Sequence, residues 1–239
     1  MASELTGPER VVVGEGEDFV AAVAAWVANS IATVLADRER CSLALSGGHT
    51  PRAIYEYLAD RYVDVPWALL DVYFGDERRV PPDDPESNYL MAYESLLGRV
   101  PIAPSRVHRM GGEREDAAVA ASAYESILPA SLDVLLLGVG VDGHTASLFP
   151  GAPQLQERER RVVPSTSPVP PTGRLTITPP VIAAASSIAV IGAGLQKAPA
   201  VARAIEGDFD PSALPVQLAL RGSWFVDRAA ASRLRGVQA

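Results

Sequence analysis

The sequence predicts an α/β fold of the Rossmann-like class, in which helices cover both faces of one open, mainly parallel twisted sheet. Short apolar runs alternate along the chain with stretches in which apolar residues recur every three or four positions, as strands alternate with helices. The 239 residues, 48% of them hydrophobic, suit a single domain over residues 1–239, with residues 1–9 as a flexible tail. Polar clusters that contain glycine follow several of the apolar runs. These clusters would lie at the carboxyl ends of the strands, which is where open parallel sheets bind ligands.

The first predicted elements are a helix, a strand and a second helix. In residues 17–36, apolar side chains recur at three and four positions from Phe19 to Leu35, so one face of a helix would be apolar. The apolar run 42–45 predicts a strand, and helical spacing resumes at Pro51. Thr50 suits the N-cap of this second helix and Pro51 its first position, because the N–H that proline lacks is not needed there.

The rest of the chain continues the alternation. The predicted strands are residues 69–74, 132–137, 175–178, 187–191 and 216–220. The predicted helices are residues 88–97, 117–128 and 198–205. Residues 154–173 carry charges followed by four prolines, which predicts an extended loop within the domain, of a kind that is often functional.

Charge and composition argue against several classes of function. A net charge of −8 lacks the basic face that a phosphate backbone requires, so nucleic acid is not an expected partner. Cys41 is the single cysteine and the first ten residues are polar, so we expect a cytoplasmic protein without disulfides. The apolar stretches 19–27 and 132–141 are shorter than a membrane span of about 20 residues, so no membrane segment is expected.

A glycine turn, Ser46-Gly47-Gly48-His49-Thr50-Pro51, joins the predicted strand 42–45 to the next helix. Two glycines let the backbone approach a ligand, and the helix start directs free N–H groups at it, which suits a phosphate group. A plain turn without a ligand would have the same features. The spacing matches neither a dinucleotide-binding loop nor a Walker loop, so no nucleotide cofactor is expected.

A second cluster, Gly75-Asp76-Glu77-Arg78-Arg79-Val80, follows the predicted strand 69–74. It could be a solvated charged loop. At the carboxyl end of a strand, however, Asp76 could bind sugar hydroxyls, and Arg78 could bind an anion or a developing oxyanion. The following Pro85-Glu86-Ser87-Asn88-Tyr89 has the pattern of a helix start and adds polar groups.

The third cluster, Gly138-Val139-Gly140-Val141-Asp142-Gly143-His144, is the most specific of the three. A lone histidine is usually structural, but this one lies in a glycine-rich loop with Asp142 two residues before it. A carboxylate beside an imidazole fixes its tautomer and stabilises the imidazolium, as a general base requires. Ser147 is a weak candidate nucleophile, because the Gly-x-Ser-x-Gly pattern is missing.

Two basic residues, Arg174 and Lys197, follow at the ends of predicted elements. Lys197 precedes a helix start at Pro199, so its ammonium and the free N–H groups of that helix could share one anion. The single cysteine and three histidines have no metal-ligand spacing, so no metal is expected.

Taken together, these motifs resemble the 6-phosphogluconolactonase family, which is related to the glucosamine-6-phosphate deaminases. The likeness rests on Ser46-Gly47-Gly48-x-Thr50-Pro51, on Gly75-Asp76-Glu77-Arg78 and on the segment from Gly138 to Pro150, in this order over nearly the whole chain. Arg174 and Lys197 match basic positions that the related deaminases use on the substrate phosphate.

The resemblance implies hydrolysis of 6-phosphogluconolactone to 6-phosphogluconate, in the oxidative pentose phosphate pathway, without a cofactor. His144 would be the general base, and Asp76 and Arg78 would lie at the sugar and carbonyl end. The expected phosphate-binding residues are Ser46, Gly47, Gly48, Thr50, Arg174 and Lys197. Four questions stay open: whether Asp142 or Asp76 orients His144; whether Arg78, Arg79 or the backbone of residues 143–145 binds the oxyanion; whether the enzyme is a monomer or a homodimer; and whether it prefers the δ-lactone or the γ-lactone.

Two alternatives have their own discriminating features. A glucosamine-6-phosphate deaminase or isomerase of the related family has a glutamate before the proline that ends the histidine loop, whereas this chain has Phe149 before Pro150. A non-enzymatic sugar-phosphate sensor would carry a helix-turn-helix module, for which the stretch before the predicted helix 17–36 is too short. Both alternatives are therefore less favoured than the lactonase.

Overall fold

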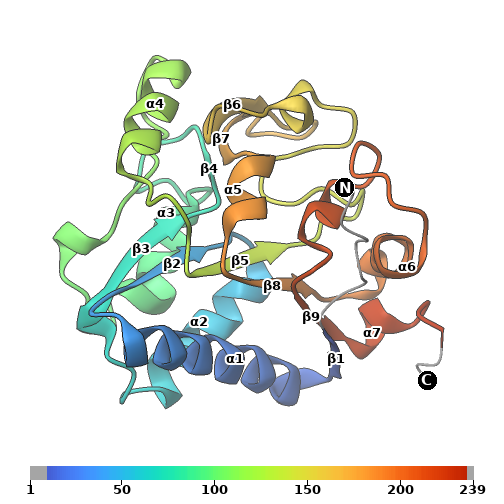
Figure 1. Ribbon diagram of the computed structural model, residues 1–239, viewed down its shortest axis with the longest axis horizontal. Coiled ribbons are helices and arrows are strands. Elements are labelled where there is room, and N and C mark those ends of the chain that lie inside the picture. The colour runs from blue at the N-terminus through green and yellow to red at the C-terminus, as the bar shows by residue number, and fades with distance from the viewer. Residues whose placement is uncertain (1–9, 236–239) are drawn as a thin grey trace.

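The computed structural model describes residues 10–235 and arranges them around a six-stranded sheet in which every strand pairing is parallel (Figure 1). In spatial order, the strands are β1 (Arg10–Gly14), β9 (Ser223–Asp227), β8 (Ser187–Gly192), β5 (Val134–Gly138), β2 (Cys41–Leu45) and β3 (Leu70–Phe74). The predicted fold class is confirmed. The expected tail, residues 1–9, lies outside the described residues.

Helices cover both faces of this sheet. The α-helices of the described residues are α1 (Gly16–Asp37), α2 (His49–Arg61), α3 (Asn88–Ala92), α4 (Ala117–Ile127), α5 (Pro179–Ala184), α6 (Ala198–Glu206) and α7 (Arg228–Ala231). Helices α1 and α2 lie along one face, and α5 lies on the opposite face (Figure 1). The predicted helix 88–97 is divided, because α3 continues as a π-helical turn, Tyr93–Leu97.

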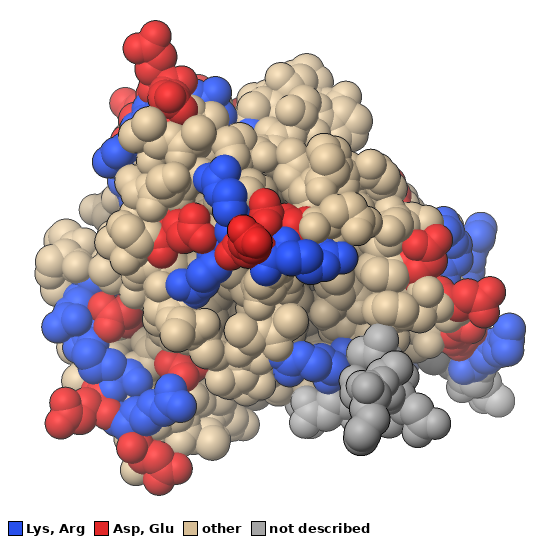
Figure 2. All heavy atoms as spheres, turned by 45° about the horizontal axis from the view of Figure 1, so that its top comes forward, with Lys and Arg blue, Asp and Glu red and all other residues tan. Residues whose placement is uncertain are grey.

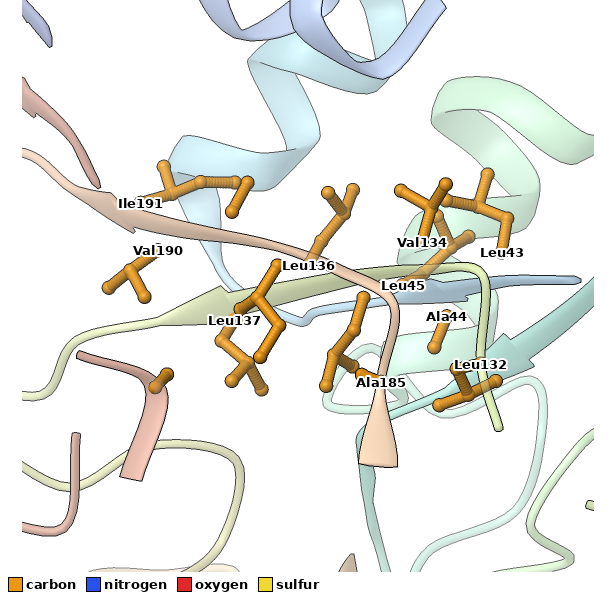
Figure 3. Packing of buried hydrophobic residues seen from close by; sticks show 14 of the residues in the cluster. Leu43, Ala44, Leu45, Leu132, Val134, Leu136, Leu137, Ala185, Val190 and Ile191 are labelled. Atoms are coloured by element: carbon orange, nitrogen blue, oxygen red, sulfur yellow. The ribbon is translucent and has the colours of Figure 1, made fainter. Parts of the chain in front are cut away.

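The core is built mainly on β2, β5 and β8, whose side chains are buried on both sides of the sheet. Figure 3 shows Leu136 and Ile191 on one side and Leu137 and Val190 on the other. Strands buried on both faces read as continuous apolar runs, which is why these three could be predicted from the sequence.

Helix α1 corrects the expectation that every apolar stretch of the chain is shorter than a membrane span. It has 22 residues and a mean hydropathy of 1.9 in its most apolar window, so by length and composition alone it could cross a membrane. Its side chains Phe19, Val23, Val27 and Ile31 are buried, and it packs against β1 and β9. A core helix of a folded domain passes the same test of length and composition.

A second, antiparallel sheet has the order β4-β7-β6, with β4 (Asp76–Arg78), β7 (Gly173–Ile177) and β6 (Val162–Thr166). The predicted strand 175–178 belongs here and not to the parallel sheet. The predicted loop 154–173 contains β6, which the prolines concealed. Pro164 is tolerated in β6 because this strand is at the edge of its sheet.

The predicted strand 216–220 is wrong, because Pro215–Ala219 form a 3₁₀ helix. A short apolar run does not distinguish a strand from a buried helical turn, and proline favours a helix start. The turn supports the third polar cluster, since Val216 N–H donates to the Gly143 carbonyl at 2.9 Å. The strand at this end of the chain is instead β9.

The fold brings the polar clusters together. Strands β8, β5, β2 and β3 are neighbours in the parallel sheet, and the clusters follow their carboxyl ends. The first strand of the second sheet, β4, begins at Asp76, two residues after the end of β3, so this sheet extends from the same end. This edge is where open parallel sheets bind ligands.

Candidate active site

The loop after β5 holds an imidazole–carboxylate pair. The Nδ1 atom of His144 lies 2.6 Å from Oδ1 of Asp142, and the His144 backbone N–H donates to the same oxygen at 3.0 Å. Burial raises the pKa of Asp142, but the hydrogen bonds from His144 outweigh it and lower that pKa to about 2. Asp142 is therefore ionised, Nδ1 is the donor, and Nε2 is the basic nitrogen. Asp142, not Asp76, orients His144.

Glycine is required where this loop folds back on itself. A Cβ atom at Gly140 would lie 2.1 Å from Nδ1 of His144 and 2.6 Å from Oδ1 of Asp142. Ala146, with φ of 47°, occupies the left-handed region that a residue with a Cβ atom rarely adopts. Such conformations persist where the surrounding structure imposes them, often at functional sites.

Asp76 connects this loop to the second polar cluster. Its Oδ2 accepts a 2.5 Å hydrogen bond from the Ser147 hydroxyl, and its Oδ1 accepts one of 3.2 Å from Nδ2 of Asn88. Ser147 is buried, and its backbone N–H donates to the Thr176 hydroxyl at 3.1 Å. Ser147 therefore positions Asp76 and is not arranged as a nucleophile.

Glu77 is a buried structural carboxylate, although the sequence suggested a charged loop. It accepts hydrogen bonds from the backbone N–H groups of Arg78, Asn88 and Tyr89, at 2.7, 2.7 and 2.9 Å. The Ser87 hydroxyl donates to it as well, at 3.1 Å. Burial raises the pKa of Glu77, and the three backbone hydrogen bonds oppose that rise. The start of α3 is thereby fixed to β4.

The two arginines of the second cluster have different places. Arg78 lines the site and donates to the Glu86 carbonyl. Arg79 points away and donates to the backbone carbonyls of Arg114 and Glu115, at 2.7 and 2.6 Å. Arg79 therefore anchors a neighbouring loop and is not placed to bind an oxyanion.

The backbone donors that were candidates for an oxyanion site are partly occupied. Gly143 N–H donates to the Gly140 carbonyl at 3.0 Å, and His144 N–H donates to Asp142. Of the alternatives named from the sequence, Arg78 is the group that lines the cavity with a charged donor.

The glycine turn after β2 is fixed by a buried tyrosine. The Tyr55 hydroxyl accepts from Ser46 N–H and donates to the Ser46 carbonyl, both at 2.9 Å. Helix α2 begins at His49 with Gly48 as its N-cap, so the prediction of Thr50 as N-cap is wrong. Gly48 has φ of 108° and no side chain, so the first N–H groups of α2 have no side-chain cap. Thr50 lies within the first turn.

These segments enclose a central cavity of about 200 Å³. Its lining includes Ser46, Gly47, Asp76, Asn88, His144 and Lys197. Burial lowers the pKa of Lys197, and the nearby Asp142 carboxylate opposes this shift. Helix α6 begins directly after Lys197. The central cavity thus combines a base, a carboxylate, an ammonium and a glycine turn.

Arg174 lines a side cavity of about 280 Å³, which shares Asp76, Arg78 and His144 with the central cavity. Its side chain is 6% exposed, and Nη1 has no hydrogen-bond partner among the described residues. Burial lowers the pKa of Arg174, and its cross-strand neighbour Arg78 lowers it further. Arg174 thus lines the side cavity and Lys197 the central cavity, and the two cavities adjoin at their shared lining residues.

Other ligand classes find less support in the described residues. Residues 10–235 contain no group of three His, Cys, Asp or Glu side chains placed to hold a metal ion. Basic and acidic side chains lie next to one another in the middle of the face shown in Figure 2, so neither sign forms an extended patch there. The absence of a cofactor and of nucleic acid stays a prediction.

Comparisons with known proteins agree with one another. The chain matches the model of the family described as glucosamine-6-phosphate isomerases/6-phosphogluconolactonase over residues 14–226. It is 38% identical to a 6-phosphogluconolactonase of Streptomyces coelicolor, over 95% of both chains. It is 39% identical to one of Nostoc sp., over 84% of this chain and 88% of the relative. A solved 6-phosphogluconolactonase from Trypanosoma brucei has a TM-score of 0.84 and 26% identity, over 96% of this chain and 100% of that one.

The close approach at Gly140 generates a prediction. In Gly140→Ala, the added methyl group must displace the His144–Asp142 pair, and a displacement of about 1 Å can cost about 100-fold in rate. We expect turnover to fall by about that factor while the melting temperature changes little. Gly75→Ala is the matched control, because a Cβ atom there would have contacts of 3.7 Å or more. Full activity in a folded Gly140→Ala variant would contradict the role of the pair.

Proposed function

Because this chain belongs to the family of glucosamine-6-phosphate isomerases and 6-phosphogluconolactonases, we propose that it hydrolyses 6-phosphogluconolactone to 6-phosphogluconate. The observation that carries the proposal is the His144–Asp142 pair, 2.6 Å apart, at the wall of a cavity that also contains Lys197 and the glycine turn. A general base beside a basic pocket suits a lactone that carries a phosphate group.

In the proposed mechanism, Nε2 of His144 accepts a proton from a water molecule as the water oxygen attacks the lactone carbonyl carbon. Asp142 stabilises the imidazolium that results. The tetrahedral intermediate then collapses, the bond between the carbonyl carbon and the ring oxygen breaks, and the imidazolium returns its proton to that oxygen. No covalent enzyme intermediate is needed, in agreement with Ser147 being bound to Asp76.

Charge stabilisation is assigned to the arginines. Arg78 lines both cavities next to His144, so its guanidinium is the proposed donor to the oxyanion. Arg174 stands opposite Arg78 in the register of β4 and β7. The two guanidiniums repel each other, and Asp76 is among the nearby carboxylates that oppose this repulsion. We assign Arg174 to the carbonyl end, where hydrolysis leaves a further carboxylate for the guanidiniums to bind. This assignment revises the expectation that Arg174 binds the phosphate.

The phosphate is assigned to the part of the central cavity that Gly47, Gly48 and Lys197 line. Helix α2 begins there without a side-chain cap. Free N–H groups at a helix start and an ammonium group together bind phosphate well. Ser46 and Thr50, at the same turn, complete the proposed phosphate-binding set.

Phe149 argues against a deaminase of the related family. Its ring centroid lies 4.9 Å from that of His144, in the part of the loop where the deaminase sequence has a glutamate. A phenyl ring cannot relay a proton, whereas a lactonase needs only one base and an oxyanion donor.

The direct test of the proposal is lactone hydrolysis by the purified protein. We expect the protein to open 6-phosphogluconolactone at a rate well above the spontaneous one. The release of acid measures this rate. His144→Ala should lower turnover by about two to four orders of magnitude, the usual effect of losing a general base. His108→Ala is the matched control, because His108 stacks on Tyr73 and bonds Asp71, away from both cavities. An inactive parent protein, or a His144→Ala variant with the parental rate, would contradict the proposal.

Loss of the Asp142 carboxylate tests the pairing of His144 with Asp142. The hydrogen bonds from His144 outweigh the effect of burial and lower the pKa of Asp142 to about 2, so this carboxylate is ionised at neutral pH. It stabilises the imidazolium that forms when His144 accepts a proton. Asp142→Asn should therefore lower the maximal rate, because an amide carries no charge to stabilise that imidazolium. The rate above spontaneous opening measures the effect, and a folded Asp142→Asn variant with the parental rate would contradict the role of the pair.

The phosphate assignment is tested by comparing two substrates. A charged hydrogen bond is worth roughly 1.5 to 3 kcal/mol, so Lys197→Ala should lower kcat/KM on 6-phosphogluconolactone by about tenfold to a hundredfold. Hydrolysis of unphosphorylated gluconolactone should barely change. Arg203→Ala, an exposed position on α6, is the matched control for loss of positive charge. Equal losses on both substrates would show that Lys197 does not bind the phosphate.

A further inference from the structure

Asn88 is a buried polar residue at the wall of the central cavity that neither the sequence motifs nor the proposed mechanism uses. Its side chain belongs to the first residue of α3 and is 2% exposed. Its backbone N–H donates to Glu77 at 2.7 Å, which fixes its position. From the sequence, Asn88 was assigned only to a helix start.

The neighbours of Asn88 determine which way its amide faces. Nδ2 lies 2.9 Å from the Asp76 carbonyl oxygen and 3.2 Å from Asp76 Oδ1. Both are acceptors, so only the NH₂ group can face them. The Oδ1 atom therefore points away from Asp76, toward the glycine turn, where a Cβ atom at Gly47 would lie 1.9 Å from it.

Oδ1 of Asn88 has no hydrogen-bond partner among the described residues, although it is shielded by protein. Nearly all buried polar atoms in folded proteins are hydrogen-bonded, because an unpaired one has lost its bonds to water without replacement. The amide is held on its other side by Asp76, which Ser147 holds in turn at 2.5 Å. The acceptor is thus fixed in place beside a cavity and lacks a donor.

The proposed substrate offers one kind of neutral donor. The lactone carbonyl and ring oxygen are acceptors, and an ionised phosphate accepts, which leaves the hydroxyl groups at C2, C3 and C4. We propose that Asn88 Oδ1 accepts a hydrogen bond from one of these hydroxyls and so makes Asn88 a specificity-determining residue for hydroxylated lactones. The inference rests on the proposed lactonase function. A site built to bond a hydroxyl rejects analogues that lack it, because its own acceptor is then left unpaired.

The test pairs variants of the protein with deoxy substrates. Hydrolysis by parent and Asn88→Ala is measured on 6-phosphogluconolactone and on its 2-deoxy, 3-deoxy and 4-deoxy analogues, each made by oxidation of the corresponding deoxyglucose 6-phosphate. We expect Asn88→Ala to lower kcat/KM on the complete substrate about tenfold. On one deoxy analogue, the two proteins should be nearly equal, and on the other two the loss should persist.

A second variant protects the test against misfolding of the first. Gly47→Ala leaves Asn88 in the chain but places a methyl group where its Oδ1 lies. Gly47→Ala should lower kcat/KM by the same factor, and this loss should disappear on the same deoxy analogue. Any added effect of this variant on phosphate binding is the same for all four substrates, because all four carry the phosphate. Met91→Ala is the control, because Met91 lies on the same helix but does not line the central cavity.

The outcomes separate the two proposals. An equal loss on all four substrates, or no loss on the complete one, would overturn the role of Asn88 while leaving the lactonase intact. A parent protein that hydrolyses none of the four would overturn the proposed function, and the role of Asn88 with it.

Discussion

The arrangement of the site depends on the buried carboxylate of Glu77. Its side chain is 5% exposed and has four hydrogen-bond donors, three of them backbone N–H groups. Removing a carboxylate from water is costly unless such donors replace the water. Glu77 therefore joins β4 to the start of α3, and Arg78 and Asn88 are held at the cavity wall because their backbone N–H groups bond to it.

From this junction, a chain of short contacts runs across the carboxyl edge of the parallel sheet. Asn88 donates to Asp76, and Asp76 accepts from Ser147 on the loop that carries His144. Ser147 also donates to Thr176 of β7, so the small antiparallel sheet joins the same network. The segments that carry the base, the arginines and the unpaired acceptor of Asn88 are thus joined by one network of hydrogen bonds.

The sequence predicts those features whose cause is local. The strands β2, β5 and β8 could be predicted because each is one short apolar run. The pair of Asp142 and His144 could be predicted because the two residues are close in the sequence. The bond between Ser147 and Asp76 joins residues 71 positions apart, and no short pattern indicates it. The division of Arg174 and Lys197 between two cavities likewise depends on the second sheet. That sheet was missed because β4 is short and charged and β6 contains Pro164.

A crystal structure with bound 6-phosphogluconate tests the whole account most directly. The account predicts the phosphate against Gly47, Gly48 and Lys197, and the C1 carboxylate beside Nε2 of His144 and the guanidinium of Arg78. It also predicts one hydroxyl within hydrogen-bond distance of Asn88 Oδ1. A product with its carboxylate at Lys197 and its phosphate against Arg78 and Arg174 would reverse the proposed orientation. A product whose C1 lies out of reach of His144 would contradict the general base on which the proposed function depends.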